Sequence, residues 1–285
     1  MSGSYRKVEG IFYPQDSIRC FYWIEGEKNN PPMLFLPGYT GTYAEVEGFT
    51  KLLTGDFLVI TPDLPGWGKS DAPKEDLNLQ YYGRYLGKLL DHLNIEKINV
   101  VGHCMGAAVA FEFAYQFPNR INNLILVSTP YLNNTIRGKI FSLLAQASSN
   151  VPPIIRPIFF FWRNRLFQSV MDIFSLKFKT KKQKLNFILK TIKTQHLQNE
   201  KAVEDAWNSM VCYDYSKAKQ IKKRVHLIHG DEDLLVSKNQ AQRFRSLWGD
   251  TTLDFIPGSG HIPPLESPQS LAEIIKKYLG NEKNP

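Results

Sequence analysis

The sequence has few cysteines and no long hydrophobic run. Its 3 cysteines, Cys20, Cys104 and Cys212, are too few and too scattered for a disulfide framework or a zinc site. No apolar stretch reaches the roughly 18 residues that a membrane-spanning helix needs. Residues 1–10 carry charges where a signal peptide has an apolar segment. These absences predict a soluble protein of a reducing, cytoplasmic compartment, with no metal or other cofactor.

Positive charge is concentrated in one part of the chain. The formal net charge of the 285 residues is +8. Residues 131–222 hold 16 lysines and arginines against 5 acidic residues, a net charge of +11, so the rest of the chain has a net charge of −3. A dedicated nucleic-acid binder is basic over the domain that binds. The mildly acidic remainder therefore predicts no nucleic-acid partner.

Short apolar runs alternate with helical patterns along most of the chain. Such runs suit the strands of a parallel sheet that is covered on both faces, and their alternation with helices indicates βαβ units. Two alternating segments at the start predict a hairpin. The predicted hairpin strands are 8–13 and 18–23, the apolar runs are 33–36, 57–60, 98–101, 124–127, 225–228 and 253–256, and the helical patterns are 44–53, 78–93, 105–117, 238–248 and 268–279, the last with Ser267 as its cap and Pro268 in its first turn. The pattern predicts an α/β protein with a mostly parallel twisted sheet and helices on both faces.

Residues 129–222 interrupt this alternation with helical stretches and no strand signal. We expect them to form a helical lid inserted between a first core segment, 1–128, and a second, 223–285. The apolar stretch 154–178 either packs the lid onto the sheet, lines a pocket for an aliphatic or aromatic substrate, or dips into a bilayer surface. The basic charge of this region predicts a peripheral contact with an anionic membrane or an acyl carrier. Solvated lysines around an apolar lid are the plainer alternative.

The most informative stretch is the strand-like run that ends in Gly102-His103-Cys104-Met105-Gly106 and continues into small, helix-forming residues. Glycine at both ends allows two backbone segments to approach closely around a strained turn residue, so the spacing has a steric reason. The plainer alternative is a buried structural cysteine. The context on both sides favours a sharp strand-to-helix turn, with Gly102 and Gly106 forming the elbow and Cys104 the nucleophile.

A cysteine nucleophile needs a base and an acid that orients the base. His261 lies in a glycine-rich loop after the last apolar strand, and a cluster of carboxylates follows the strand at 225–228. In chain order the acid comes between nucleophile and base. We therefore predict a catalytic triad of Cys104, His261 and Asp233, with Asp231 as the reserve acid. A carboxylate here would hold the imidazole tautomer without accepting its proton.

The oxyanion would be held by backbone N–H groups. One should belong to Met105, directly after the nucleophile, and the other to Tyr39, in the loop after an early strand. Removing one such donor typically lowers the rate by about 100-fold or more.

The chain resembles the α/β-hydrolase superfamily over nearly its full length. The motifs that carry the resemblance, in order, are Pro37-Gly38 before the oxyanion loop, 63–70 (DLPGWGKS), the elbow, 229–233 (HGDED) and Gly260-His261. In that family the acid lies three residues after the glycine that closes its strand, which again selects Asp233. The resemblance implies the α/β-hydrolase fold with its lid, and a structural turn at Asp63. His103 and His229 are interpreted as supporting residues.

The chain departs from the family where Pro37 replaces the usual histidine and Cys104 the usual serine. A cysteine nucleophile on this fold is similar to those of dienelactone hydrolases and polyhydroxyalkanoate synthases. A free thiol has a pKa of about 8.5 and attacks once a histidine takes its proton. Because the acyl-enzyme would be a thioester, activated acyl donors are favoured.

Three functions fit these residues. The first is hydrolysis of a hydrophobic ester, thioester or lactone through an acyl-Cys104 intermediate, as in an esterase or thioesterase. The second is acyl transfer from Cys104 to an alcohol, amine or acyl acceptor, favoured if the lid excludes water. The third is a non-catalytic ligand-binding module on the same fold.

Overall fold

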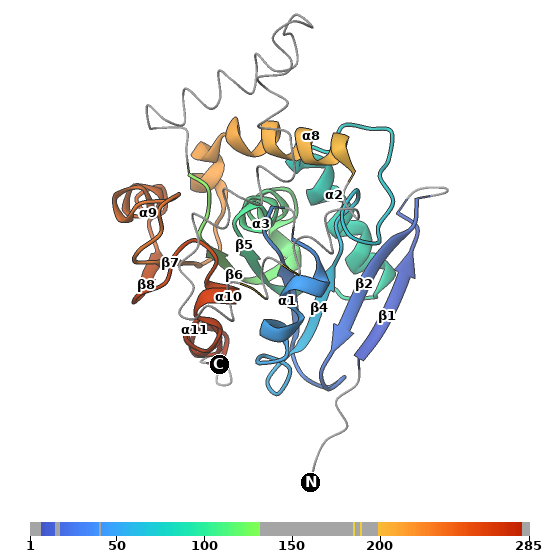
Figure 1. Cartoon of the computed structure of the whole chain (residues 1–285), viewed down its shortest axis with the longest axis horizontal. Coiled ribbons are helices and arrows are strands. Elements are labelled where there is room, and N and C mark those ends of the chain that lie inside the picture. Colours follow the sequence, from blue (N-terminus) through green and yellow to red (C-terminus); the bar gives the residue numbers. More distant parts are fainter. Residues whose placement is uncertain are drawn as a thin grey trace, which may run out of the picture.

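One sheet of eight strands organises the described part of the protein (Figure 1). The computed structural model describes residues 7–14, 18–39, 41–131, 185, 189 and 199–280. The strand order is β1-β2-β4-β3-β5-β6-β7-β8, in which β2 is antiparallel to both of its neighbours and all other pairs are parallel. The strands are β1 (Lys7–Phe12), β2 (Cys20–Glu25), β3 (Pro32–Leu36), β4 (Leu58–Pro62), β5 (Ile98–His103), β6 (Ile121–Val127), β7 (Val225–Gly230) and β8 (Thr251–Ile256). The predicted α/β class and mostly parallel sheet are confirmed.

All six short apolar runs form parallel strands, and the two alternating segments at the start form an antiparallel pair. The apolar runs are continuous because the central strands are buried on both faces, as in β5 and β7, where every residue is buried. The predicted boundaries differ by one or two residues in most strands. Strand β6 begins three residues earlier, at Ile121, because Asn122 and Asn123 join the strand although their side chains are polar.

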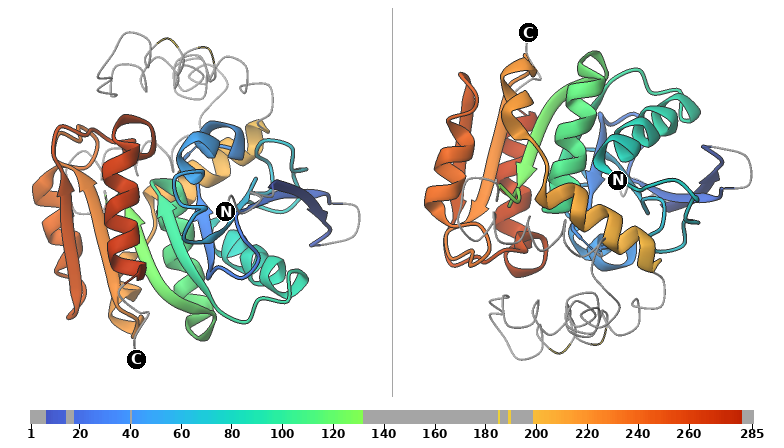
Figure 2. Two further views of the ribbon diagram at one scale, coloured as in Figure 1. Left: turned by 90° about the horizontal axis from the view of Figure 1, so that it is seen from below. Right: turned by 90° about the horizontal axis from the view of Figure 1, so that it is seen from above.

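Helices cover both faces of the sheet, as the two views of Figure 2 show. Residues of α2 (Leu79–His92), α3 (Met105–Gln116) and α9 (Lys238–Arg245) pack in one apolar cluster with alternate residues of the sheet, such as Leu124 and Leu126. Residues of α1 (Tyr43–Thr50) and α11 (Pro268–Gly280) pack in a second cluster with Ile125 and Val127 on the other face. The period of two along β6 therefore divides the core into two layers.

The helix ends follow local side-chain chemistry. The Asn78 side chain accepts a hydrogen bond from the N–H of Tyr81 at the start of α2, and Ser237 forms a capping box with Gln240 at the start of α9. Pro268 opens α11 as predicted. Ser267 directly precedes α11 as predicted, and its backbone oxygen accepts the N–H of Leu271 at 3.1 Å, but its hydroxyl is buried and has no hydrogen-bond partner among the described residues. The same residue follows the short helix α10 (Pro263–Glu266).

Most of the predicted lid, including the apolar stretch 154–178 and much of the basic segment 131–222, lies outside the described residues. The described part contains α8 (Glu200–Val211) and the 3₁₀ turn η3 (Tyr215–Gln220), and no strand. Helix α8 lies over the loops that leave the carboxyl ends of β3 and β4, where Tyr39 Oη donates to Val203 O at 3.0 Å and Asn199 N donates to Gly66 O at 3.0 Å. None of the described helices has the length and apolar character to cross a membrane.

Candidate active site

Cys104 occupies a strained turn between β5 and α3. Its φ of 50° is in the left-handed region that L-residues with a side chain rarely adopt. A Cβ placed on Gly102 would lie 2.3 Å from Gly106 O, and one on Gly106 would lie 2.2 Å from Leu36 O. The two glycines are therefore required by close backbone contacts, and the predicted elbow has its steric basis. The N–H of Cys104 donates to Val127 O at 2.9 Å, which ties the turn to the end of β6.

The three residues of the predicted triad lie in one hydrogen-bonded row. His261 Nε2 is 3.2 Å from Cys104 Sγ, and His261 Nδ1 is 2.9 Å from Asp233 Oδ2. Because a carboxylate only accepts hydrogen bonds, Nδ1–H donates to Asp233 and Nε2 faces the thiol. His261 and Asp233 are 5% and 8% exposed, so water competes little for these contacts.

The carboxylate of Asp233 is fixed from the other side by its own loop. Its Oδ1 accepts the N–H groups of Leu235 at 2.8 Å and Val236 at 2.9 Å. The reserve acid, Asp231, lies elsewhere: its Oδ1 accepts the N–H of Gly258 at 2.6 Å, and its Oδ2 is 3.6 Å from Lys238 Nζ. Only one of the two candidate acids contacts His261.

The surroundings of Asp233 and His261 favour the ionised forms of both side chains, the carboxylate and the imidazolium. Burial disfavours the charged form of Asp233, but His261 and the two backbone donors outweigh it, and the pKa of Asp233 is lowered. Burial also disfavours the imidazolium of His261, but the negative charges of Asp233 and of a Cys104 thiolate together raise the pKa of His261 well above its ordinary value. The imidazole is therefore suited to accept a proton from the thiol.

A family model for the alpha/beta hydrolase fold matches residues 31–268, which is most of the chain. The chain belongs to the α/β-hydrolase family. An uncharacterized protein of Mycobacterium tuberculosis is 27% identical over 269 residues, which cover 88% of this chain and 76% of that protein. A hydrolase from Pseudomonas aeruginosa has a similar structure, with a TM-score of 0.78, 17% identity and coverage of 98% of this chain and 100% of the other. The 2-hydroxy-6-oxo-6-phenylhexa-2,4-dienoate hydrolase of a Rhodococcus species has a TM-score of 0.76, with 17% identity and coverage of 97% and 100%. The protein is an enzyme of the hydrolase class.

In this α/β hydrolase, the loop that carries His261 is clamped by Glu266, a residue that the sequence did not single out. Oε2 of Glu266 accepts the N–H of Gly260, and Oε1 accepts the N–H of Ile262 at 3.0 Å, so one carboxylate holds the backbone on both sides of the histidine. Glu266 is 2% exposed, and burial raises its pKa although the two backbone donors oppose the rise. The only signal in the sequence is an acidic residue in an otherwise apolar segment just after His261.

His103 holds the same loop from the side of the elbow. Its Nε2–H donates to the backbone oxygen of His261 at 2.9 Å. Burial, and then the charge of His261, lower the pKa of His103 to about 3, so its imidazole is neutral and can serve as a fixed donor. His229 is also buried, but neither of its ring nitrogens has a hydrogen-bond partner among the described residues.

The two predicted oxyanion donors lie at the loop and the helix that border Cys104. Met105 is the first residue of α3, where backbone N–H groups have no partner within the helix. A Cβ placed on Gly38 would lie 3.4 Å from Cys104 Cβ and 2.8 Å from His103 Nδ1, so the backbone next to Tyr39 passes directly over the elbow. The side chain of Tyr39 extends away toward α8, with its ring 5.5 Å from that of Trp207. The use of these two N–H groups stays a prediction.

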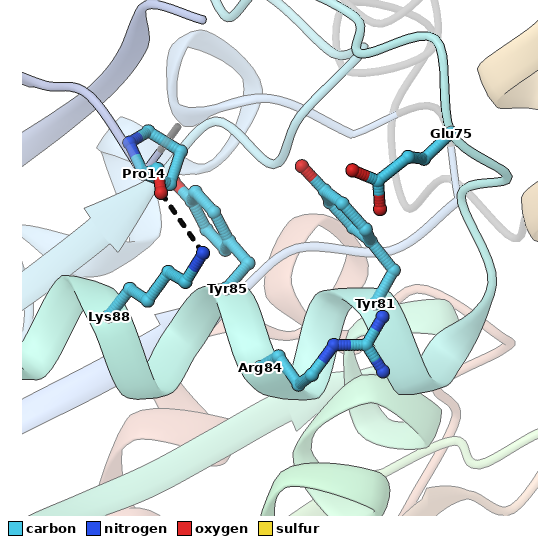
Figure 3. Close-up of a pocket in the computed structure, with 6 residues that line it drawn as sticks. All are labelled: Pro14, Glu75, Tyr81, Arg84, Tyr85 and Lys88. Atoms are coloured by element: carbon cyan, nitrogen blue, oxygen red, sulfur yellow. Dashed lines mark hydrogen bonds between the residues drawn. The ribbon is translucent and has the colours of Figure 1, made fainter. Parts of the chain in front are cut away.

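A pocket lies beside α2, away from the candidate active site (Figure 3). Tyr81, Arg84, Tyr85 and Lys88 come from α2, and Lys88 Nζ donates to the backbone oxygen of Pro14 at 3.0 Å. The lining of this pocket is mostly polar and includes none of the predicted site residues.

Proposed function

We propose that this α/β hydrolase cleaves a hydrophobic ester, thioester or lactone through an acyl-Cys104 intermediate. The observation that carries the proposal is the row Cys104 Sγ, His261 and Asp233, with contacts of 3.2 Å and 2.9 Å. A nucleophile in contact with a base, which is in turn oriented by a carboxylate, is the arrangement that acyl transfer needs.

In the first half-reaction, His261 Nε2 takes the proton of the Cys104 thiol while Sγ bonds to the carbonyl carbon of the substrate. The carbonyl oxygen becomes an oxyanion, which accepts hydrogen bonds from the backbone N–H groups of Tyr39 and Met105 in this proposal. When the oxyanion collapses, the bond to the leaving alkoxide or thiolate breaks. The leaving group takes the proton from His261, and Cys104 is left as a thioester.

In the second half-reaction, His261 removes a proton from water, and the hydroxide oxygen bonds to the thioester carbon. Collapse of this second oxyanion breaks the bond from carbon to Sγ, and the proton of His261 returns to the thiolate. Attack by a thiol on a thioester replaces one thioester by another and is nearly balanced in free energy. Attack on an alkyl ester replaces a stable ester by a less stable thioester and is therefore unfavourable. We therefore expect thioesters and other activated donors to acylate Cys104 fastest.

The direct test is the mass of the intact protein after incubation with an acyl thioester. Because Cys212 is an exposed cysteine, the measurement uses a Cys212→Ala background to remove unspecific exchange. We expect one acyl group per chain at Cys104 and none in the Cys104→Ala variant. An adduct that persists after Cys104→Ala would overturn the proposal.

The fate of the acyl group is read in the same experiment by adding an alcohol or an amine. Release of the free acid at an unchanged rate supports hydrolysis. Release as a new ester or amide at the expense of the acid would instead assign the protein to the acyltransferases.

A further inference from the structure

Buried polar atoms without partners gather at the carboxyl ends of β6 and β7, next to the proposed nucleophile. The hydroxyls of Ser128 and Thr129 and both ring nitrogens of His229 have no hydrogen-bond partner among the described residues. All three residues are 0% exposed. Leaving a buried polar group unpaired costs about 1–3 kcal/mol. Such a group calls for an explanation, and several at one place point to a ligand.

The register of the sheet places these residues side by side. Val127 pairs with Ile228, and one residue further along, Ser128 N donates to Ile228 O at 2.8 Å. Ser128 therefore lies beside His229. Because the N–H of Cys104 donates to Val127 O, Cys104 is also a neighbour of this position. Ser128 has a φ of 47°, so its backbone is held in the same strained region as that of Cys104.

His229 continues the alternation of Val225 and Leu227 along β7, so its side chain points to the face of the sheet that α3 and α9 cover. On that face Tyr215 packs its ring 5.0 Å from Phe111 of α3 and 5.1 Å from Phe244 of α9. The hydroxyl of Tyr215 is buried and has no partner among the described residues.

Tyr215 lies on the same side of the sheet as His229, because its ring packs in the apolar cluster that also contains Val225 and Leu227 of β7. Burial raises the pKa of Tyr215, so its phenol stays neutral and can both donate and accept a hydrogen bond.

The chemistry of Ser128, His229 and Tyr215 favours a neutral ligand that can both donate and accept hydrogen bonds. Burial lowers the pKa of His229 to about 4, so its imidazole is neutral, with one donor and one acceptor. The hydroxyls of Ser128 and Tyr215 also donate and accept. A buried ion would need a counter-charge that these groups do not supply. A hydroxyl group meets the requirement.

We propose that Ser128, His229 and Tyr215 form a subsite beside Cys104 that binds a hydroxyl group on the acyl part of the substrate, so that hydroxyacyl esters or thioesters are the preferred donors. This inference rests on the proposed acyl-Cys104 mechanism. Ser128 directly follows Val127, whose backbone oxygen accepts the N–H of Cys104. We therefore expect the hydroxyl group of the substrate on one of the first carbons after its carbonyl carbon.

The test compares two thioesters of N-acetylcysteamine, butyryl and 3-hydroxybutyryl, in the Cys212→Ala background. The rate of acylation of Cys104 is followed by intact mass. We expect the hydroxyacyl donor to react at least about tenfold faster, since a site built for a hydroxyl discriminates against an analogue that lacks it. In Tyr215→Phe, and separately in Ser128→Ala, this ratio should fall at least about threefold toward one.

Thr61→Val is the matched control. Thr61 on β4 also has a buried hydroxyl without a partner among the described residues, but its strand is separated from β5 by β3 and lies on the opposite side from β6. In Thr61→Val, the ratio of the acylation rates with the 3-hydroxybutyryl and butyryl donors should equal that of the unmodified protein. A ratio near one in the unmodified protein, with Cys104 acylated by butyryl, would mean that the subsite holds an internal water, and would overturn this inference while leaving the proposed function intact. No acylation by either donor would overturn the proposed function itself.

Discussion

Two buried aspartates at the carboxyl edge of the sheet show what separates a structural carboxylate from a candidate catalytic one. Asp63 follows β4 and Asp233 follows β7, and both lie in glycine-containing turns with little exposure. Each accepts two backbone N–H groups. Asp63 uses both oxygens for this, since Oδ1 accepts from Tyr43 N and Oδ2 from Lys69 N, each at 2.9 Å.

Asp233 uses only Oδ1 for its two backbone donors, which leaves Oδ2 for the imidazole of His261. The electrostatics differ in the same way. Burial raises the pKa of Asp63 to about 6 despite its donors, whereas the histidine outweighs burial at Asp233 and its pKa is lowered. Asp63 binds backbone N–H groups with both carboxylate oxygens and so stabilises a turn. Asp233 binds them with Oδ1 alone, which leaves Oδ2 to orient the imidazole of His261.

The largest expected effect is on activity, from Asp233→Asn. The amide can no longer hold His261 in the tautomer that faces the thiol, so kcat/KM should fall by about 10³- to 10⁴-fold, as for the buried acid of other triads. The measurement is hydrolysis of an acyl thioester at neutral pH, with circular dichroism to verify the fold.

Asp231→Asn is the control, since Asp231 lies two residues away and binds Gly258 and Lys238 instead of the histidine. Its activity should stay within about threefold of the unmodified protein, as for most surface changes. If Asp231→Asn had the larger effect, the roles of the two acids would be exchanged.

The sequence predicts those parts of the site that depend on local geometry and chain order. Gly102 and Gly106 mark the elbow because their lack of a Cβ is needed within a few residues of Cys104. Asp233 and His261 follow from their places after strands in a known order, and the fold brings them together with Cys104. The alternation of apolar runs and helices likewise suffices for the parallel sheet.

Contacts that arise only from packing could not be predicted. Glu266 clamps the loop of His261 because α10 turns its carboxylate back toward Gly260 and Ile262, and no spacing rule anticipates that turn. The missing partners of Ser128 and His229 are properties of the folded surroundings and leave no trace in composition or period. Ser267 lies at the predicted start of α11, but the sequence pattern does not indicate the preceding helix α10, nor that the Ser267 hydroxyl is buried and makes no capping hydrogen bond among the described residues.

The next effect is on stability, from Asp63→Ala. This change leaves the N–H groups of Tyr43 and Lys69 without their carboxylate acceptor, and the turn that it organises is tight, since a Cβ on Gly68 would lie 2.0 Å from Asp63 Oδ2. We expect the free energy of unfolding to fall by about 2–6 kcal/mol, because two N–H groups lose their acceptor at about 1–3 kcal/mol each. Urea titration measures the change. Asp233→Asn should lose less stability than Asp63→Ala, and the opposite order would contradict the comparison.

The smallest effect is the pH dependence of stability, which should have opposite signs at the two aspartates. The folded protein binds a proton at Asp63 more tightly than the unfolded chain does, because the pKa of Asp63 rises from 3.8 to about 6 on folding. The stability that Asp63 contributes is thus fully present below pH 3.8 and lost as pH rises through about 6, a change of about 3 kcal/mol at most.

At Asp233 the folded pKa is lowered, so its contribution is present above the unfolded pKa and lost as pH falls through the folded one. Unfolding free energies of the unmodified protein, Asp63→Asn and Asp233→Asn are measured by urea titration from pH 3 to 7 and compared by difference. The Asp233→Asn difference reports the Asp233–His261 pair, because Asp233 also raises the pKa of His261. The advantage of the unmodified protein over Asp63→Asn should shrink between pH 4 and 6, while its advantage over Asp233→Asn should shrink only below pH 4 within the acidic range. Two difference curves with the same slope in acid would mean that the histidine does not distinguish the two carboxylates. The separation between a structural and a candidate catalytic aspartate, drawn from the hydrogen bonds of their oxygens, would then fail.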